Sequence, residues 1–234
     1  MAAVPVTAAL ILVGFVYVLS WFRRRRVIPV WRASVFLCGL FSVWLAAASP
    51  LAMLDEEMLT AHMLQHLLLM TLGPPLILLG FPTLRLHANP VFCWLASAIV
   101  LTGWHVPAVF ALGLSSHLWH LIEHATFFAA GLLFWIPVVP SLPGGSRPQW
   151  SIVIYLFLGT LPCDALSAFL AFRGHVVYPI YFSSSQPFGL SALEDQQCAG
   201  ALMWTCVTFA YLIPAVLVTL RLLSSAGNST EKDI

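Results

Sequence analysis

Charged residues are scarce in this chain of 234 residues. Asp, Glu, Lys and Arg together make up 8% of the sequence, whereas hydrophobic residues make up 60%. Soluble domains usually contain about 45 to 50% apolar residues. The composition therefore excludes an ordinary soluble domain and predicts a polytopic membrane protein. The formal net charge of +1 does not indicate a nucleic-acid partner, so we expect contact with membrane lipids and not with nucleic acid.

Paired cysteines are absent as well. The five cysteines show no CxxC spacing, and all lie in or beside apolar segments: Cys38, Cys93, Cys163, Cys198 and Cys206. This pattern indicates neither a zinc ribbon nor a disulfide framework. We interpret most of these cysteines as small buried hydrophobic residues.

Positive residues are missing before the first apolar run. A cleavable signal peptide carries them there, whereas here Arg23, Arg24, Arg25 and Arg26 follow the run. We therefore predict that residues 3–22 form a retained transmembrane helix.

Seven mainly apolar runs are each long enough to cross a membrane. A spanning helix needs about 20 such residues, and the charged and Pro/Gly-rich joints divide the chain into runs at 3–22, 30–49, 58–80, 91–112, 118–139, 150–171 and 199–222. The joints are short, and no internal repeat is evident. We predict an all-α fold in which residues 1–234 form one membrane domain, a bundle of seven transmembrane helices.

The few charges predict the orientation of this bundle. Cytoplasmic loops carry an excess of Lys and Arg, and one set of loops and the C-terminal tail hold the arginines at 23–26 and 32 together with Arg85, Arg147, Arg221 and Lys232. The opposite loops hold Asp55, Glu56, Glu57, Glu194 and Asp195, with Arg173 as the exception. We therefore expect the N-terminus outside and the C-terminus in the cytoplasm.

Seven of the eight histidines map to the outer side of this topology. They are His62 and His66 on the third span, His105 on the fourth, His117, His120 and His124 on the fifth, and His175 in the next outer loop, whereas His87 is cytoplasmic. Ionisable groups at membrane depth are expensive and usually pair, line a cavity or bind something. The alternative is that each histidine only forms local hydrogen bonds at a helix end.

Helical spacing places these histidines on two faces. Residues at i, i+3, i+4 and i+7 share a face, so His62 and His66 form one stripe, and His117, His120 and His124 form a second. Gly73 and Gly131 continue the two stripes, and small residues allow helices to approach closely. Both stripes are therefore predicted to face the bundle interior, where they favour ligation of a metal or haem.

Further polar and sulfur-containing residues are predicted at the same outer depth. They include Asp164 on the sixth span, Asp195 and Gln196 at the outer start of the seventh, Met203 within the seventh, and Met63 and Met70 beside the first histidine pair. Imidazole suits zinc, copper, iron and nickel, whereas thioether sulfur favours cuprous copper. The mixture favours copper, with zinc and haem left open.

Four stretches resemble the CtaG-type cytochrome c oxidase assembly factors. They are "HMLQHLLLMTLGPPLILLG" (62–80), "GWHVPAVF" (103–110), "HLWHLIEHATFFAAGLLFWIPVV" (117–139) and "LEDQQCAGALMW" (193–204). The resemblance covers residues 30–220. It implies seven transmembrane helices in a bacterial cytoplasmic (inner) membrane and a role in maturing the oxidase by helping copper to reach its haem-copper centre. The implied partners are oxidase subunits and a periplasmic copper chaperone.

The resemblance and the spacing together define the candidate site. The candidate metal ligands are His62, His66, His105, His117, His120, His124 and Met203. The residues expected to orient them are Gln65, Glu123, Asp164, Asp195 and Gln196. The leading hypothesis is an assembly factor, not an enzyme, that binds copper transiently on its outer face.

Two other functions remain open from the sequence. An intramembrane zinc hydrolase would use the HxxxH pairs as ligands, with Asp164 or Glu123 as the proton acceptor. A haem b protein would use His66 together with His120 or His124 as axial ligands. A transporter is less favoured because the polar groups end in the outer half and leave no inner pathway.

Overall fold

The computed structural model describes residues 3–81, 88–142, 148–183 and 187–230, and this part of the chain contains helices and no strand. The α-helices are α1 (Ala3–Arg24), α2 (Val30–Ala47), α3 (Leu59–Leu67), α4 (Gly73–Gly80), α5 (Pro90–Trp104), α6 (Pro107–Gly113), α7 (His117–Trp135), α8 (Trp150–Phe172) and α9 (Ala192–Thr230). The shorter elements are a π-helical turn (Leu68–Leu72) and 3-10 turns at Pro50–Met53, Val139–Ser141, Pro179–Ser183 and Pro187–Gly189. The predicted all-α membrane fold is confirmed: six helical segments are long and apolar enough to span a membrane, and the bent α5–α6 pair makes a possible seventh.

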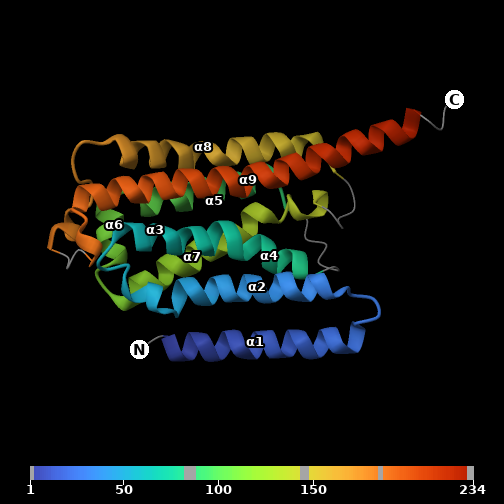
Figure 1. The fold of residues 1–234 in the computed structure, drawn as a ribbon, viewed down its shortest axis with the longest axis horizontal. Helices are drawn as coiled ribbons and strands as arrows, with labels where there is room; N and C mark the ends of the chain where they lie inside the picture. The colour runs from blue at the N-terminus through green and yellow to red at the C-terminus, as the bar shows by residue number, and fades with distance from the viewer. Residues whose placement is uncertain (1–2, 82–87, 143–147, 184–186, 231–234) are drawn as a thin grey trace.

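The third predicted span, 58–80, lies at the centre of the bundle as α3, the π-helical turn and α4 (Figure 1). Pro74 and Pro75 follow the π-helical turn, and proline has no N–H to donate to the preceding turn. Partners from other helices bind the backbone there: Ser42 Oγ donates to the Leu68 carbonyl at 3.1 Å, and Trp135 Nε1 donates to that of Met70 at 3.3 Å. Side chains of neighbouring helices therefore supply hydrogen bonds to backbone carbonyls of the π-helical turn.

The fourth predicted span, 91–112, is not one straight helix. Helices α5 and α6 meet at an angle of 82°. Pro107 begins α6, and a residue before proline is driven out of the helical region, as the ψ of 126° at Val106 shows. His105 therefore sits at a corner of the backbone.

The last predicted span, 199–222, is longer in the structure because α9 begins at Ala192. Ser191 and Glu194 form a capping box: the Ser191 N–H donates to Glu194 Oε2 at 2.8 Å, and the Glu194 N–H donates to Ser191 Oγ at 3.3 Å. The polar run from Glu194 to Gln197 thus forms the first turns of a helix instead of a loop.

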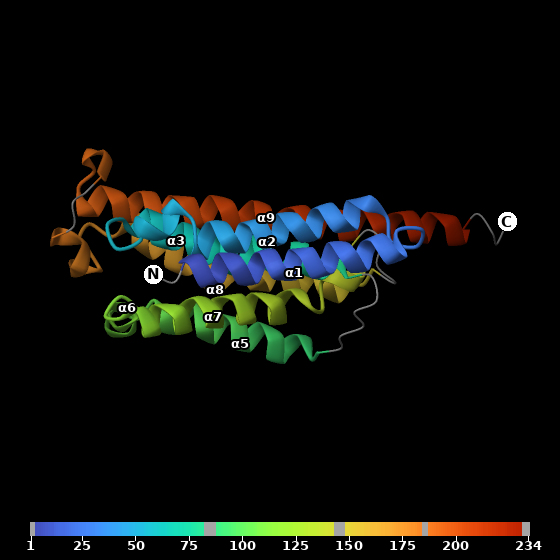
Figure 2. The ribbon, with the colours of Figure 1, turned by 90° about the horizontal axis from the view of Figure 1, so that it is seen from below.

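Close packing joins α7 to the central span. A Cβ atom at Gly131 would lie 2.6 Å from the carbonyl oxygen of Met70 and 2.7 Å from Cγ of Pro74. Helix α5 lies beside α7 on its other side (Figure 2). Helices α3, α5 and α7 therefore bring the predicted histidine stripes together.

The N-terminus and the histidine-bearing ends of α3 and α7 lie at one end of the bundle, and the C-terminus lies at the other (Figure 1). The sequence likewise predicts the N-terminus and these histidines on one side of the membrane and the C-terminus on the other. Which of the two sides faces outward stays a prediction. Fusions of a fluorescent cytoplasmic reporter after Arg26 and Pro90 should be active, and fusions of alkaline phosphatase near Glu57 and Ser115 should be active outside. The reverse pattern in both reporters would contradict the predicted orientation.

Candidate metal centre

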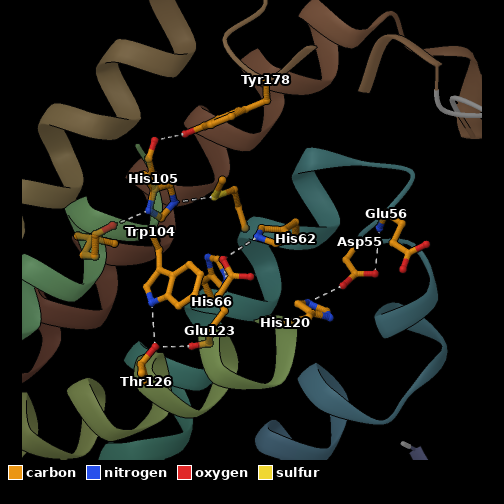
Figure 3. Close-up of polar contacts among 12 residues, drawn as sticks. Asp55, Glu56, His62, His66, Trp104, His105, His120, Glu123, Thr126 and Tyr178 are labelled. Carbon is orange, nitrogen blue, oxygen red and sulfur yellow. Dashed lines mark hydrogen bonds and ion pairs between the residues drawn. The ribbon is translucent and has the colours of Figure 1, made fainter. Parts of the chain in front are cut away.

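Three buried side chains from two helices form a compact group. His62 and His66 lie one turn apart on α3, and Glu123 comes from α7. Oε1 of Glu123 lies 3.4 Å from Nε2 of His62 and 3.4 Å from Nε2 of His66 (Figure 3). One possible ligand atom of each residue lies within 4.8 Å of the other two. We call these three residues the inner group.

The polar atoms of the inner group are suited to a metal ion. Among the described residues, none of the ring nitrogens of His62 and His66 and neither carboxylate oxygen of Glu123 has a hydrogen-bond partner. A buried polar group without a partner costs about 1 to 3 kcal/mol. In a tetrahedral site with bonds of ~2.0 to 2.1 Å, ligand atoms are about 3.3 to 3.4 Å apart. The spacing and the donor types therefore fit zinc or copper.

Helix α6 covers the inner group. A Cβ atom at Gly113 would lie 2.6 Å from Oε2 of Glu123, so a larger residue there would displace the carboxylate. Phe110 on the same helix packs against His62, with 4.8 Å between the ring centroids. The break before Pro107 thus positions a short helix as the wall of the group.

A second group lies beside the first. Nε2 of His120 contacts Oδ2 of Asp55 at 2.9 Å, and one ligand atom each of Asp55, His120 and His124 lies within 4.8 Å of the other two. We call these residues the outer group. Its rings adjoin the inner group, because the His62 and His120 centroids are 6.0 Å apart.

Asp55 is a site residue that the sequence did not predict. It lies in the segment between α2 and α3 rather than on a helix, so helical spacing could not relate it to the histidines. Its one signal was its place in the acidic loop just before α3. Tyr181 fixes its backbone by donating a hydrogen bond to the Asp55 carbonyl at 2.9 Å. Burial raises the pKa of the Tyr181 phenol well above its usual value, which keeps this donor protonated.

Comparison with known proteins supports the family resemblance of the sequence. A family model described as the cytochrome c oxidase caa3 assembly factor (CtaG type) matches residues 13–225. The chain belongs to this family. Three uncharacterised mycobacterial proteins are also similar, each 24% identical: those of Mycobacterium bovis and Mycobacterium tuberculosis over 86% of this chain, and that of Mycobacterium leprae over 93%.

The chain spans only 35 to 38% of the length of these mycobacterial relatives. No solved structure matches it. The apolar helices indicate a multi-pass membrane protein, and a bacterial cytoplasmic membrane is consistent with both the family and the relatives.

Two polar residues that we expected to orient the ligands, Asp195 and Gln196, form hydrogen bonds to the backbone of other segments. Asp195 accepts hydrogen bonds from the N–H groups of Leu59 (2.6 Å) and Thr60 (3.2 Å) at the start of α3. Gln196 accepts one from the Val177 N–H at 2.7 Å. Asp195 therefore caps the helix that carries His62 and His66 and orients them through the backbone.

Three other predicted residues lie outside both groups. His117 is the first residue of α7 and is exposed. Asp164 is half-buried on α8, and its Oδ1 atom has no hydrogen-bond partner among the described residues. Met203 is buried on α9 and lines a small cavity together with His66 and His105. His87, predicted to lie apart from the site, falls outside the described residues.

Gln65 and His105 lie next to the inner group. Gln65 is fully buried on α3 between the two histidines in sequence, and its amide atoms have no hydrogen-bond partner among the described residues. The His105 ring centroid lies 5.7 Å from that of His66. The backbone carbonyl of His105 accepts a hydrogen bond from the Tyr178 hydroxyl at 2.9 Å, which holds the corner between α5 and α6.

Proposed function

We propose that this protein assists the maturation of cytochrome c oxidase by binding copper in the inner group and passing it to an oxidase subunit. The observation that carries the proposal is the arrangement of His62, His66 and Glu123 around one point, with buried nitrogen and oxygen atoms that lack hydrogen bonds to the described residues. Copper is the cargo of this process, so the protein itself need not catalyse a reaction.

The outer group gives the copper a route to the inner group. The His120 side chain is 20% exposed, whereas those of His62 and Glu123 are fully buried. A metal arriving from the outer side would meet His120 first, whose partner Asp55 is buried, and would then find the His62 ring of the inner group 6.0 Å away, centroid to centroid. A periplasmic copper chaperone is the expected donor.

Exchange between partners requires ligands that release the metal. Imidazole and carboxylate ligands hold copper without the closed cage of thiolates that a storage site would use. In the inner group each helix contributes ligands to a shared centre, so a small separation of α3 from α7 would weaken binding. This supports transfer to an oxidase subunit over permanent retention.

The two rival functions receive less support. Two histidines and a glutamate also form a set of catalytic zinc ligands. With Glu123 as a ligand, however, the proton acceptor of a hydrolase would have to be Asp164, which belongs to neither group. The cavity beside His66 and His105 has a volume of about 30 Å³. That volume is sufficient for an ion or a water molecule and far too small for a porphyrin.

Deletion of the gene tests the proposed role. Under copper limitation, the deletion strain should still synthesise the oxidase subunits, but the oxidase should lack copper and activity, since delivery has failed. A terminal oxidase that contains no copper should work normally in the same cells and serves as the control. The measurements are immunoblots of the subunits, copper content of the purified oxidase and respiratory activity. A fully loaded, active oxidase in the deletion strain would refute the proposal.

A further inference from the structure

His105 and Met63 make a contact that hydrogen bonding does not explain. Nδ1 of His105 lies 2.7 Å from the carbonyl oxygen of Leu101, and Nε2 lies 3.1 Å from Sδ of Met63. A carbonyl oxygen only accepts, so Nδ1 carries the proton, and the Nε2 of a neutral ring then presents a lone pair. A thioether sulfur has no hydrogen to donate. Two buried lone pairs therefore face each other.

The alternative of a doubly protonated His105 has little support. It would place a positive charge in a buried site, which is expensive unless a negative group compensates it. The hydrogen-bond contacts of His105 are a backbone carbonyl and a thioether sulfur in the described part of the chain, and no carboxylate is among them. A cation bound between Nε2 and Sδ would remove the repulsion between the two lone pairs.

Soft ligands surround this contact. His105 and Met63 line the cavity of about 30 Å³ that Met70, Met203 and Cys163 also line. All five residues are buried, and they come from the central span, the end of α5, α8 and α9. Uncharged thioether sulfur and imidazole nitrogen together select cuprous copper over zinc and other divalent ions.

The backbone also favours a cation here. His105 is the C-cap residue that follows the last residue of α5, and the C-terminal end of a helix carries a partial negative charge. The chain bends by 82° between α5 and α6, and His105 at this corner is buried. A monovalent cation gains from this charge without needing a carboxylate ligand.

We infer that Nε2 of His105 and Sδ of Met63 form the core of a separate cuprous copper site, completed by Met203 from α9. The inference rests on the proposed copper function and deepens it: the inner group would hold copper by nitrogen and oxygen, and this site would hold Cu(I) by sulfur and nitrogen. Copper arrives already in the cuprous state, so no electron transfer is involved. His66, which lines the cavity and belongs to the inner group, connects the two sites.

Titration of Cu(I) into the full-length protein, purified in detergent and kept anaerobic, tests the inference. A chromophoric cuprous chelator competes for the metal, and X-ray absorption of the loaded protein reports whether sulfur is bound. The wild type should show copper–sulfur scattering. Met63→Leu should bind one equivalent of copper less and lose that scattering, or should bind that equivalent at least about 10 to 100-fold more weakly. Losing even a residue that only orients a ligand typically weakens binding by this factor. Met203→Leu should weaken the same equivalent.

The variants include a control for unfolding. Met-to-Leu changes conserve volume and usually cost less than about 1.5 kcal/mol, so the variants should remain folded. Met53→Leu changes an exposed methionine, 76% accessible, and should leave both stoichiometry and scattering unchanged. Copper–sulfur scattering that persists in Met63→Leu would overturn the inference.

The outcomes also separate this inference from the proposed function. Copper bound by nitrogen and oxygen alone in the wild type would overturn the sulfur site and leave the inner group intact. Copper bound by sulfur alone, unchanged in His62→Ala, would support the sulfur site and refute copper binding by the inner group. No copper binding at all would refute both.

Discussion

Replacing Glu123 by glutamine is expected to abolish copper loading of the oxidase while the protein remains in the membrane. Oε1 of Glu123 is the atom that both histidines of α3 share, at 3.4 Å each. Glutamine keeps the shape but loses the negative charge and offers a weak ligand. The same loss of oxidase copper and activity is expected for His62→Ala, which removes a buried ligand, and for His66→Ala, His120→Ala and His124→Ala.

The stability of the metal-free Glu123→Gln protein shows whether Glu123 serves a metal site or a structural ion pair. Breaking a buried ion pair by removing one partner usually costs about 3 to 5 kcal/mol. If Glu123 serves the metal, the metal-free Glu123→Gln protein should instead be as stable as the metal-free wild type, because the carboxylate is buried without a hydrogen-bond partner among the described residues. Thermal unfolding of both proteins in detergent, with chelator present, measures this.

His117→Ala provides the matched control for these variants. His117 lies on the same helix as Glu123 but is exposed and belongs to neither group, so its loss should leave oxidase activity near the wild-type level. Membrane immunoblots, oxidase copper content and oxidase activity are compared across the set. Normal copper loading in Glu123→Gln and His62→Ala would show that the inner group is structural.

The Gly131→Ala variant should accumulate poorly and unfold at a lower temperature. The new methyl group would lie 2.6 Å from the carbonyl oxygen of Met70, and backbone in a central span cannot move aside as a flexible side chain does. Overpacking of this kind costs about 1 to 3 kcal/mol. It would also push α7 away from the central span, so Glu123 would lose its position between His62 and His66.

Gly103→Ala is the control for this change. Its Cβ atom would meet nothing within 4 Å, and alanine favours a helix over glycine by up to about 1 kcal/mol, so this variant should be at least as stable as the wild type. Fluorescence-detected size-exclusion chromatography after heating measures both variants. Equal stability of the two alanine variants would contradict the close packing of α7 on the central span.

The sequence predicted the elements of this protein well because their signals are local. Apolar length identified the spanning segments, and a spacing of four residues put His62 and His66 on one face of a helix. The misplaced features also have local explanations: Pro107 signalled the break that bends the fourth span, and Ser191 with Glu194 signalled the early start of α9. These signals were present but were outweighed by the apolar runs around them.

Only the tertiary structure decided which polar residues meet. Asp195 caps a helix that begins 136 residues earlier in the chain, Glu123 lies between two histidines of another helix, and Asp55 pairs with His120. Such contacts depend on how each helix is rotated and shifted against its neighbours. In a membrane bundle, helices are apolar on nearly every side, so the pattern of polar and apolar residues fixes this rotation only weakly, and close packing at residues such as Gly131 and Gly113 determines it.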